Sequence, residues 1–312
     1  MFFLKKLLLK VPFFNKIHQK KLERIVLEGH KETEIIWEGI TSDYFSGKIA
    51  KHEIKPKQNL LNEKIIWQYW GQGLQDAALP EVVKMCFHSV DKYKGDHEVI
   101  RLSDETIGDY IDLPDFVYEK LKNNPEFNRV FFSDLLRLAL LKVYGGIWLD
   151  ATIMLTGPLP IQFINSKYFV YQRDDHEPLK AYWQRTDVYY WGWRPEFKVR
   201  SLNSVIFAQR DNIIITTLFD LILYYWKTKD HVVNYFFFQI LYNLLVQRWF
   251  LNEKCLVISD TIPHLLQAKI KMPNTKFITY KNVVKLGTIH KTRYKYKGKA
   301  LKRLKIFYEK YV

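Results

Sequence analysis

Apolar segments of two kinds alternate along the first half of the chain. Residues 63–71 form a β-branched and aromatic run that enters a Gly-Gln-Gly turn, which predicts a buried strand and its loop. Residues 80–93 predict a helix, residues 97–101 predict a second strand, and residues 129–144 show the clearest helical periodicity. Strands that alternate with helices in this way predict an α/β fold, with a mostly parallel sheet flanked by helices.

Two glycines, Gly145 and Gly146, end the last of these helices. The apolar residues 147–149 that follow predict a short buried strand, and Asp150 stands at its end. Ligands bind beyond the carboxyl ends of the strands in sheets of this type. We therefore expect Trp70 and Asp150 to face one crevice.

The second half of the chain is more aromatic. Residues 168–193 are rich in Tyr, Trp, Arg and Asp, which suits the apolar faces and hydroxyl edges of sugar rings; the alternative is a loop or hairpin packed by its own aromatics. Residues 213–226 and 232–249 predict helices, and residues 276–290 predict short strands. The helix at 232–249 is expected to be buried rather than to span a bilayer, because it carries three amide side chains.

A chain of 312 residues suits one large α/β domain with appendages, or two small domains. The pattern predicts a helical basic N-terminal extension at residues 1–58, a central domain at residues 59–290 and a basic C-terminal tail at residues 291–312. Two cysteines without a CxxC pair predict neither a disulfide framework nor a cysteine zinc site, and they fit a reducing cytoplasm.

The net charge of +15 favours a polyanionic partner: nucleic acid, anionic lipid or a phosphate-bearing substrate. Basic residues are dense at residues 1–25 and 291–310, which suits attachment to a surface better than a nucleic-acid groove. The alternative is that the basic ends only aid solubility.

Residues 1–10, MFFLKKLLLK, are interrupted by lysines, lack a cleavage site and are too short to cross a bilayer. They predict an amphipathic helix in the membrane interface, with Phe2, Phe3, Leu7 and Leu8 toward the lipid and the lysines on phosphates. The alternative is a helix docked on the protein's own core.

The candidate chemistry lies around the glycine pair. Asp134 and Arg137 stand three residues apart and therefore share one helix face, and Asp150 is brought to the sheet edge. The carboxylates suit sugar hydroxyls or a divalent metal, and the guanidinium suits phosphate or sugar oxygens. The alternative is a buried Asp–Arg pair with an unrelated Asp150.

The segments SDLLRLALLKVYGGIWLDAT and KIIWQYWG together resemble the capsular polysaccharide synthesis family, which is related to glycosyltransferase family 32. The likeness covers residues 62–155 well and the rest loosely. It implies a GT-A-like fold, a nucleotide-sugar donor that is UDP-linked, and usually a manganese or magnesium ion.

The resemblance also implies roles for single residues. Trp67 or Trp70 would stack on the nucleotide base, and Asp150 would be the first acid of a DxD-like motif whose second acid is replaced by Thr152. The catalytic set it implies is Asp150, Asp134 and Arg137. The donor-binding set it implies is Trp67, Gln68, Trp70, Asp134, Arg137, Asp150, Thr152 and Lys291.

The metal set is Asp150, Thr152 and His290. Because threonine is a weak neutral ligand, the metal is either held loosely, held through the diphosphate, or absent. His290 and Lys291 are candidates for the charge that the diphosphate leaving group needs. Asp174 and Asp175 are candidates for the carboxylate base that activates the acceptor hydroxyl. The alternative is that both belong to an ordinary solvated turn.

Together with this resemblance, the observations above predict a bacterial enzyme, a hexosyltransferase-type glycosyltransferase of capsular or other surface polysaccharide synthesis. Its acceptor would be a lipid-linked or other oligosaccharide. The protein would lie on the cytoplasmic side of the cell membrane, where its basic termini would attach it peripherally. The alternatives are a membrane scaffold, a nucleic-acid-binding protein and a nucleotide-sugar hydrolase. The sequence has no RNP, zinc-finger or helix-turn-helix pattern of a nucleic-acid-binding protein. Neither a membrane scaffold nor a nucleic-acid-binding protein explains Asp134, Arg137 and Asp150.

Overall fold

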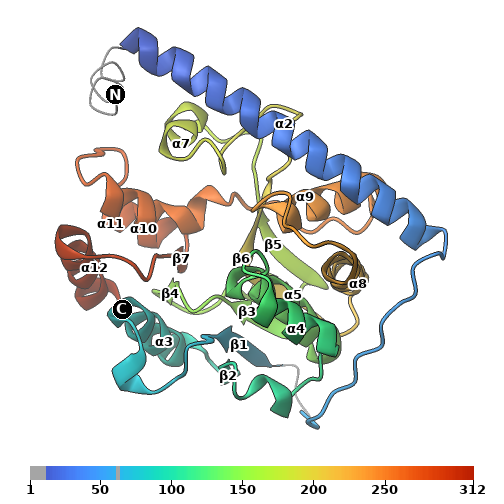
Figure 1. Cartoon of the computed structure of the whole chain (residues 1–312). Coiled ribbons are helices and arrows are strands. Elements are labelled where there is room, and N and C mark those ends of the chain that lie inside the picture. Colours follow the sequence, from blue (N-terminus) through green and yellow to red (C-terminus); the bar gives the residue numbers. More distant parts are fainter. Residues whose placement is uncertain (1–11, 61–63) are drawn as a thin grey trace.

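A computed structural model describes residues 12–60 and 64–312 of the chain (Figure 1). The predicted amphipathic segment at residues 1–10 lies outside the described residues, so its membrane role stays a prediction. Within the described ranges, no helix is both long and apolar enough to cross a membrane.

The central sheet has the strand order β2-β1-β3-β6-β5. Strand β1 (Ile65–Tyr69) pairs in parallel with β2 (Glu98–Leu102) and β3 (Gly146–Leu149), as predicted. Strand β6 (Ser201–Ala208) runs antiparallel to both β3 and β5 (Tyr168–Gln172). The sheet is therefore mixed rather than mostly parallel. Helices cross over between the parallel strands, whereas β5 returns to the antiparallel β6 through a long segment that contains only the short helix α7 (Lys180–Thr186).

Helix α5 (Arg129–Tyr144) carries the candidate chemistry and has the bounds that its periodicity predicts. Asn128 caps its first turn by accepting a hydrogen bond from Val130 N at 2.9 Å. Gly145 ends it with φ at 70°, and a Cβ there would lie 2.7 Å from the backbone nitrogen of Arg210. The glycine is needed for both its backbone angle and its close packing.

Helix α2 (Pro12–Phe45) runs along one side of the molecule (Figure 1) and packs on α9 (Phe237–Leu244). Its Trp37 is fully buried and donates from Nε1 to Phe237 O at 2.9 Å. The predicted extension is thus helical over Pro12–Phe45, but this helix shares the core of the central domain. The helix predicted at 232–249 begins later, at Phe237, and ends in a π-helical segment, Leu245–Trp249.

The C-terminal prediction of short strands at 276–290 is wrong for most of that segment. Thr279 accepts a hydrogen bond from Asn282 N at 3.1 Å and starts helix α11 (Tyr280–Leu286), which buries Val283. A strand follows only at β7 (Ile289–Lys291), which pairs antiparallel with β4 (Ile153–Leu155).

The predicted basic tail is a helix, α12 (Gly298–Tyr311), held against the body by buried Leu304 and Phe307. The remaining helices are α3 (Glu81–Tyr93), α4 (Asp115–Asn123), α6 (Ile161–Ile164), α7 (Lys180–Thr186), α8 (Ile213–Thr228) and α10 (Thr261–Lys271). Helices α10, α11 and α12 gather at one side of the molecule (Figure 1).

Candidate active site

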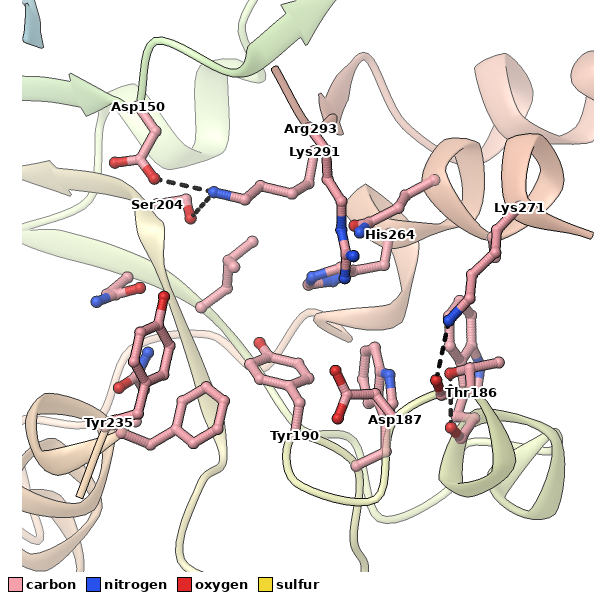
Figure 2. Close-up of a pocket in the computed structure, with 18 of the residues that line it drawn as sticks. Asp150, Thr186, Asp187, Tyr190, Ser204, Tyr235, His264, Lys271, Lys291 and Arg293 are labelled. Carbon is pink, nitrogen blue, oxygen red and sulfur yellow. Dashed lines mark hydrogen bonds and ion pairs between the residues drawn. The ribbon is translucent and has the colours of Figure 1, made fainter. Parts of the chain in front are cut away.

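Side chains from both halves of the chain enclose a cavity of about 370 Å³ beside Asp150. Figure 2 shows Lys291 directed at Asp150 and Ser204 on one side, Lys271 against Thr186 on the opposite side, and Tyr190 and Asp187 between them. The cavity is lined by Val130, Asp134, Arg137, Asp150, Trp183, Thr186, Asp187, Tyr190, Trp191, Leu202, Asn203, Ser204, Tyr235, Phe236, Gln239, His264, Gln267, Ala268, Lys271, Met272, Lys291 and Arg293.

Asp134 and Arg137 meet at the buried end of this cavity, one helical turn apart. Arg137 Nη1 lies 3.0 Å from Asp134 Oδ1, and both side chains are almost fully buried. Asn203 donates from Nδ2 to the same oxygen at 2.8 Å, and Arg137 donates to the backbone oxygen of Asn203 at 2.6 Å. Burial raises the pKa of Asp134 to about 6, against the lowering effect of Arg137.

Asp150 follows β3 and faces the same group. Trp148 donates from Nε1 to Asp150 Oδ1 at 2.8 Å, and Arg137 Nη2 lies 3.4 Å from that oxygen. Lys291 Nζ lies 2.9 Å from Asp150 Oδ2. Burial alone would raise the pKa of Asp150, but the charges of Lys291 and Arg137 and the hydrogen bonds lower it to about 2. Asp150 is therefore ionised at neutral pH.

Strand β7 decides which of two neighbouring candidates reaches the cavity. Successive side chains of a strand point to opposite faces, and Lys291 takes the cavity face. His290 is fully buried on the other face, where its Nε2 lies 2.8 Å from Thr156 Oγ1. Burial lowers the pKa of His290 to about 3, so its ring is neutral. The structure does not bring His290 to Asp150.

The remaining predicted donor residues lie outside the cavity lining. Trp67 is fully buried and donates to Gly145 O at 3.0 Å, while Trp70 is partly exposed and packs on Tyr294 with ring centroids 5.3 Å apart. Gln68 is buried and accepts from Arg101 Nε at 3.1 Å. Of the two tryptophans predicted for base stacking, only Trp70 is accessible; its role stays a prediction.

Tyr190 and Trp191 form an aromatic wall of the cavity, and they come from the segment predicted either to bind sugar or to pack on its own aromatics. The rings of this segment do pack on one another, and its binding of sugar stays a prediction. Tyr190 and Trp191 line the cavity, while Arg173 holds their loop from behind. Arg173 donates to both oxygens of Asp260 at 2.9 Å and to the backbone oxygen of Tyr190 at 2.9 Å. Burial lowers the pKa of the neighbouring His264 to about 4, and its Nδ1 donates to Asp260 O at 2.7 Å.

Asp187, Tyr190 and Trp191 were marked in the sequence only as part of the aromatic segment 168–193, and His264 and Arg293 were not marked at all. Asp174 and Asp175, weighed there as possible bases, line a separate cavity of about 390 Å³. Asp174 Oδ1 accepts from the backbone nitrogen of His176 at 2.8 Å, and the exposed Asp175 pairs with Arg200. Their contacts are those of a solvated turn.

The predicted metal ligands do not fit a metal as they are arranged. Both oxygens of Asp150 are engaged by Trp148, Arg137 and Lys291, and Thr152 and His290 lie outside the cavity lining. In the described part of the chain, no group of three or more His, Cys, Asp or Glu side chains is placed to hold a metal ion.

Comparison with known proteins adds one strong match. The sequence model of a family described as "Capsular polysaccharide synthesis protein" matches residues 16–311. Among curated proteins, none matches the sequence significantly. A solved structure titled "PaToxG Glycosyltransferase" is similar at 15% identity and a TM-score of 0.36, over 91% of this chain and 95% of that one. That likeness is too distant to carry an argument about fold or activity.

Proposed function

The chain belongs to the capsular polysaccharide synthesis protein family, and from this premise we propose that it is a glycosyltransferase acting in the synthesis of a capsular or other surface polysaccharide. It would take a hexose from a UDP-linked donor and pass it to a lipid-linked or other oligosaccharide. We assign it a GT-A-like fold related to glycosyltransferase family 32, with Asp150-Ala151-Thr152 as its DxD-like motif.

One observation carries the proposal: a single cavity joins an ionic end to an aromatic wall. Asp134, Arg137, Asp150 and Lys291 offer fixed carboxylates for sugar hydroxyls and cations for phosphate oxygens. Tyr190 and the adjacent rings offer apolar surface to the face of a sugar. A cavity of about 370 Å³ is in the size range of small-molecule sites.

A panel of nucleotide sugars tests this proposal directly. Binding is measured by calorimetry, and release of the nucleotide is measured with and without an oligosaccharide acceptor. We expect one donor to bind and to be slowly hydrolysed, and acceptor to increase its turnover. If no nucleotide or nucleotide sugar binds, the proposal fails; if donor is consumed equally fast with every acceptor and with none, the chain is a nucleotide-sugar hydrolase.

We also propose that the protein attaches peripherally to the cytoplasmic face of the cell membrane. Residues 261–312 hold 14 Lys and Arg against one Glu, so nearly all of the net charge lies there. On α12, Lys299 and Lys302 are exposed three residues apart, and the nearby Ile306 is 49% exposed. Such a basic helix suits an anionic lipid surface.

Reversing two charges on α12 tests the attachment. We expect the wild type to sediment with phosphatidylglycerol vesicles at low salt, and Lys299→Glu with Lys302→Glu to weaken binding about tenfold or more, since each basic residue near the surface contributes about 1 kcal/mol. The matched control reverses the exposed Lys51 and Lys55, which lie far from α12 in sequence. Equal loss in both double variants would point to non-specific charge attraction instead.

A further inference from the structure

The cation next to Asp150 is held in place by the backbone. Strand β7 pairs with β4 so that Lys291 lies opposite Ile153, three residues after Asp150. Thr292 donates from its backbone nitrogen to Thr152 O at 2.9 Å and from Oγ1 to the same oxygen at 2.8 Å. These bonds tie the segment that carries Lys291 to the DxD-like turn itself, so Lys291 Nζ is fixed between Asp150 and Ser204 Oγ, 2.5 Å away.

The same segment supplies a second positively charged side chain, Arg293. Arg293 lines the cavity, is exposed, and makes no ion pair with any residue that the structure describes. Its guanidinium faces the amide oxygen of Gln267 when that amide is oriented to suit its neighbours. Arg293 is therefore positioned but not neutralised, whereas Arg137 is already shared by Asp134 and Asp150.

A divalent ion would bind at Asp150, but the structure places the side chain of Lys291 there, Arg293 in the same cavity, and no set of metal ligands among the described residues. A metal ion at Asp150 would have to displace Lys291 from the carboxylate, and neither Thr152 nor His290 lines the cavity to complete its coordination. Two fixed positive charges have the same total charge as one divalent ion, and charged donors that are already oriented stabilise a developing anion without reorganisation.

We propose that Lys291 and Arg293 bind the diphosphate of the donor and stabilise it as the leaving group, so that this chain transfers sugar without a divalent metal. The inference rests on the proposed function. In the step, the bond from the anomeric carbon to the phosphate oxygen breaks and its electron pair goes to that oxygen. The acceptor hydroxyl oxygen forms the new bond to the anomeric carbon, and its proton passes to solvent. Lys291 and Arg293 offset the charge that develops on the diphosphate.

Metal removal and charge removal test the inference together. The donor found in the panel is turned over by wild-type protein in excess EDTA and again in millimolar Mn²⁺, and rates are compared with those of Lys291→Met and Lys291→Arg. We expect wild-type rates within about twofold of each other in the two conditions. Lys291→Met should lose about 10²–10³-fold in kcat, the range for removing one donor to a developing anion, and Lys291→Arg should recover part of it. Lys122→Met is the control, because Lys122 is exposed in the last turn of α4 and lines neither cavity.

Each other outcome has one meaning. Wild-type turnover that collapses in EDTA and returns with Mn²⁺ overturns the inference and leaves the glycosyltransferase proposal standing. A Lys291→Met variant that binds donor and keeps the wild-type kcat also overturns it. If no donor is turned over in EDTA or in Mn²⁺, the proposed function itself fails.

Discussion

Replacing Asp150 by asparagine is expected to reduce sugar transfer about 10³-fold while the protein stays folded. Asparagine has nearly the same shape and keeps an oxygen for Trp148, but it removes the charge that orients Lys291 and Arg137 toward the cavity. Loss of one fixed electrostatic group in a catalytic site typically lowers kcat by about 10²–10³-fold, and here two cations lose their partner at once. Initial rates at saturating donor measure the effect.

The control for this variant is Asp175→Asn, which removes an exposed carboxylate that pairs with Arg200 outside the cavity. It should transfer sugar at the wild-type rate. An Asp150→Asn protein that retains more than a tenth of wild-type activity would remove Asp150 from the catalytic set.

The Asp150→Asn variant should also differ from wild type in its response to pH. The pKa of Asp150 lies at about 2 in the folded chain, below the usual 3.8, so its ionised form stabilises the fold above about pH 4. That contribution is lost as pH falls from about 4 to about 2. The stability difference between the two proteins should therefore shrink across this window, as measured by urea unfolding.

Replacing Arg173 by methionine is expected to destabilise the protein by about 3–5 kcal/mol, the cost of leaving a buried charge without its partner. Arg173 and Asp260 are both fully buried and form a two-bond pair. Arg173 also donates to the backbone oxygens of Tyr190 and Gly192, behind the aromatic wall. Its loss should therefore weaken donor or acceptor binding as well as the fold.

The midpoint of urea unfolding, followed by tryptophan fluorescence, measures this loss. Arg200→Met is the matched control, because it breaks a second Arg–Asp bridge whose carboxylate, on Asp175, is 66% exposed. Exposed pairs contribute about 0–1 kcal/mol, so this variant should unfold close to the wild type. Equal destabilisation by both substitutions would show that burial of the Arg173–Asp260 pair is not what stabilises the loop.

The candidate site was readable from the sequence where it depends on local geometry. The three-residue spacing of Asp134 and Arg137 places them on one helix face in any α-helix, and they form a 3.0 Å pair. The glycine pair and the apolar run after it predict a strand that ends at Asp150. The roles assigned to these residues in donor binding and catalysis remain predictions.

Other features of the site were not readable, because they depend on which distant segments meet. His264 reaches the cavity from α10 and Arg293 from the loop after β7, both more than 100 residues beyond Asp150, and nothing in their local sequence marks them. His290 and Lys291 are adjacent, and only the register of β7 against β4 decides that Lys291 faces the cavity and His290 the core.

The sequence by itself therefore determined the order of helices and strands from β1 to β3, the α5 helix with its glycine stop and the acid at the end of β3. Hydrophobic periodicity and glycine stereochemistry act over a few residues, so they are visible in a single chain. Only the tertiary structure decided that β6 runs antiparallel, that the C-terminal basic segment is a packed helix, and that Lys291 faces Asp150. These outcomes depend on burial and strand pairing between segments far apart in sequence. The local sequence is compatible with either strand direction and with either face of β7, so long-range packing makes the choice.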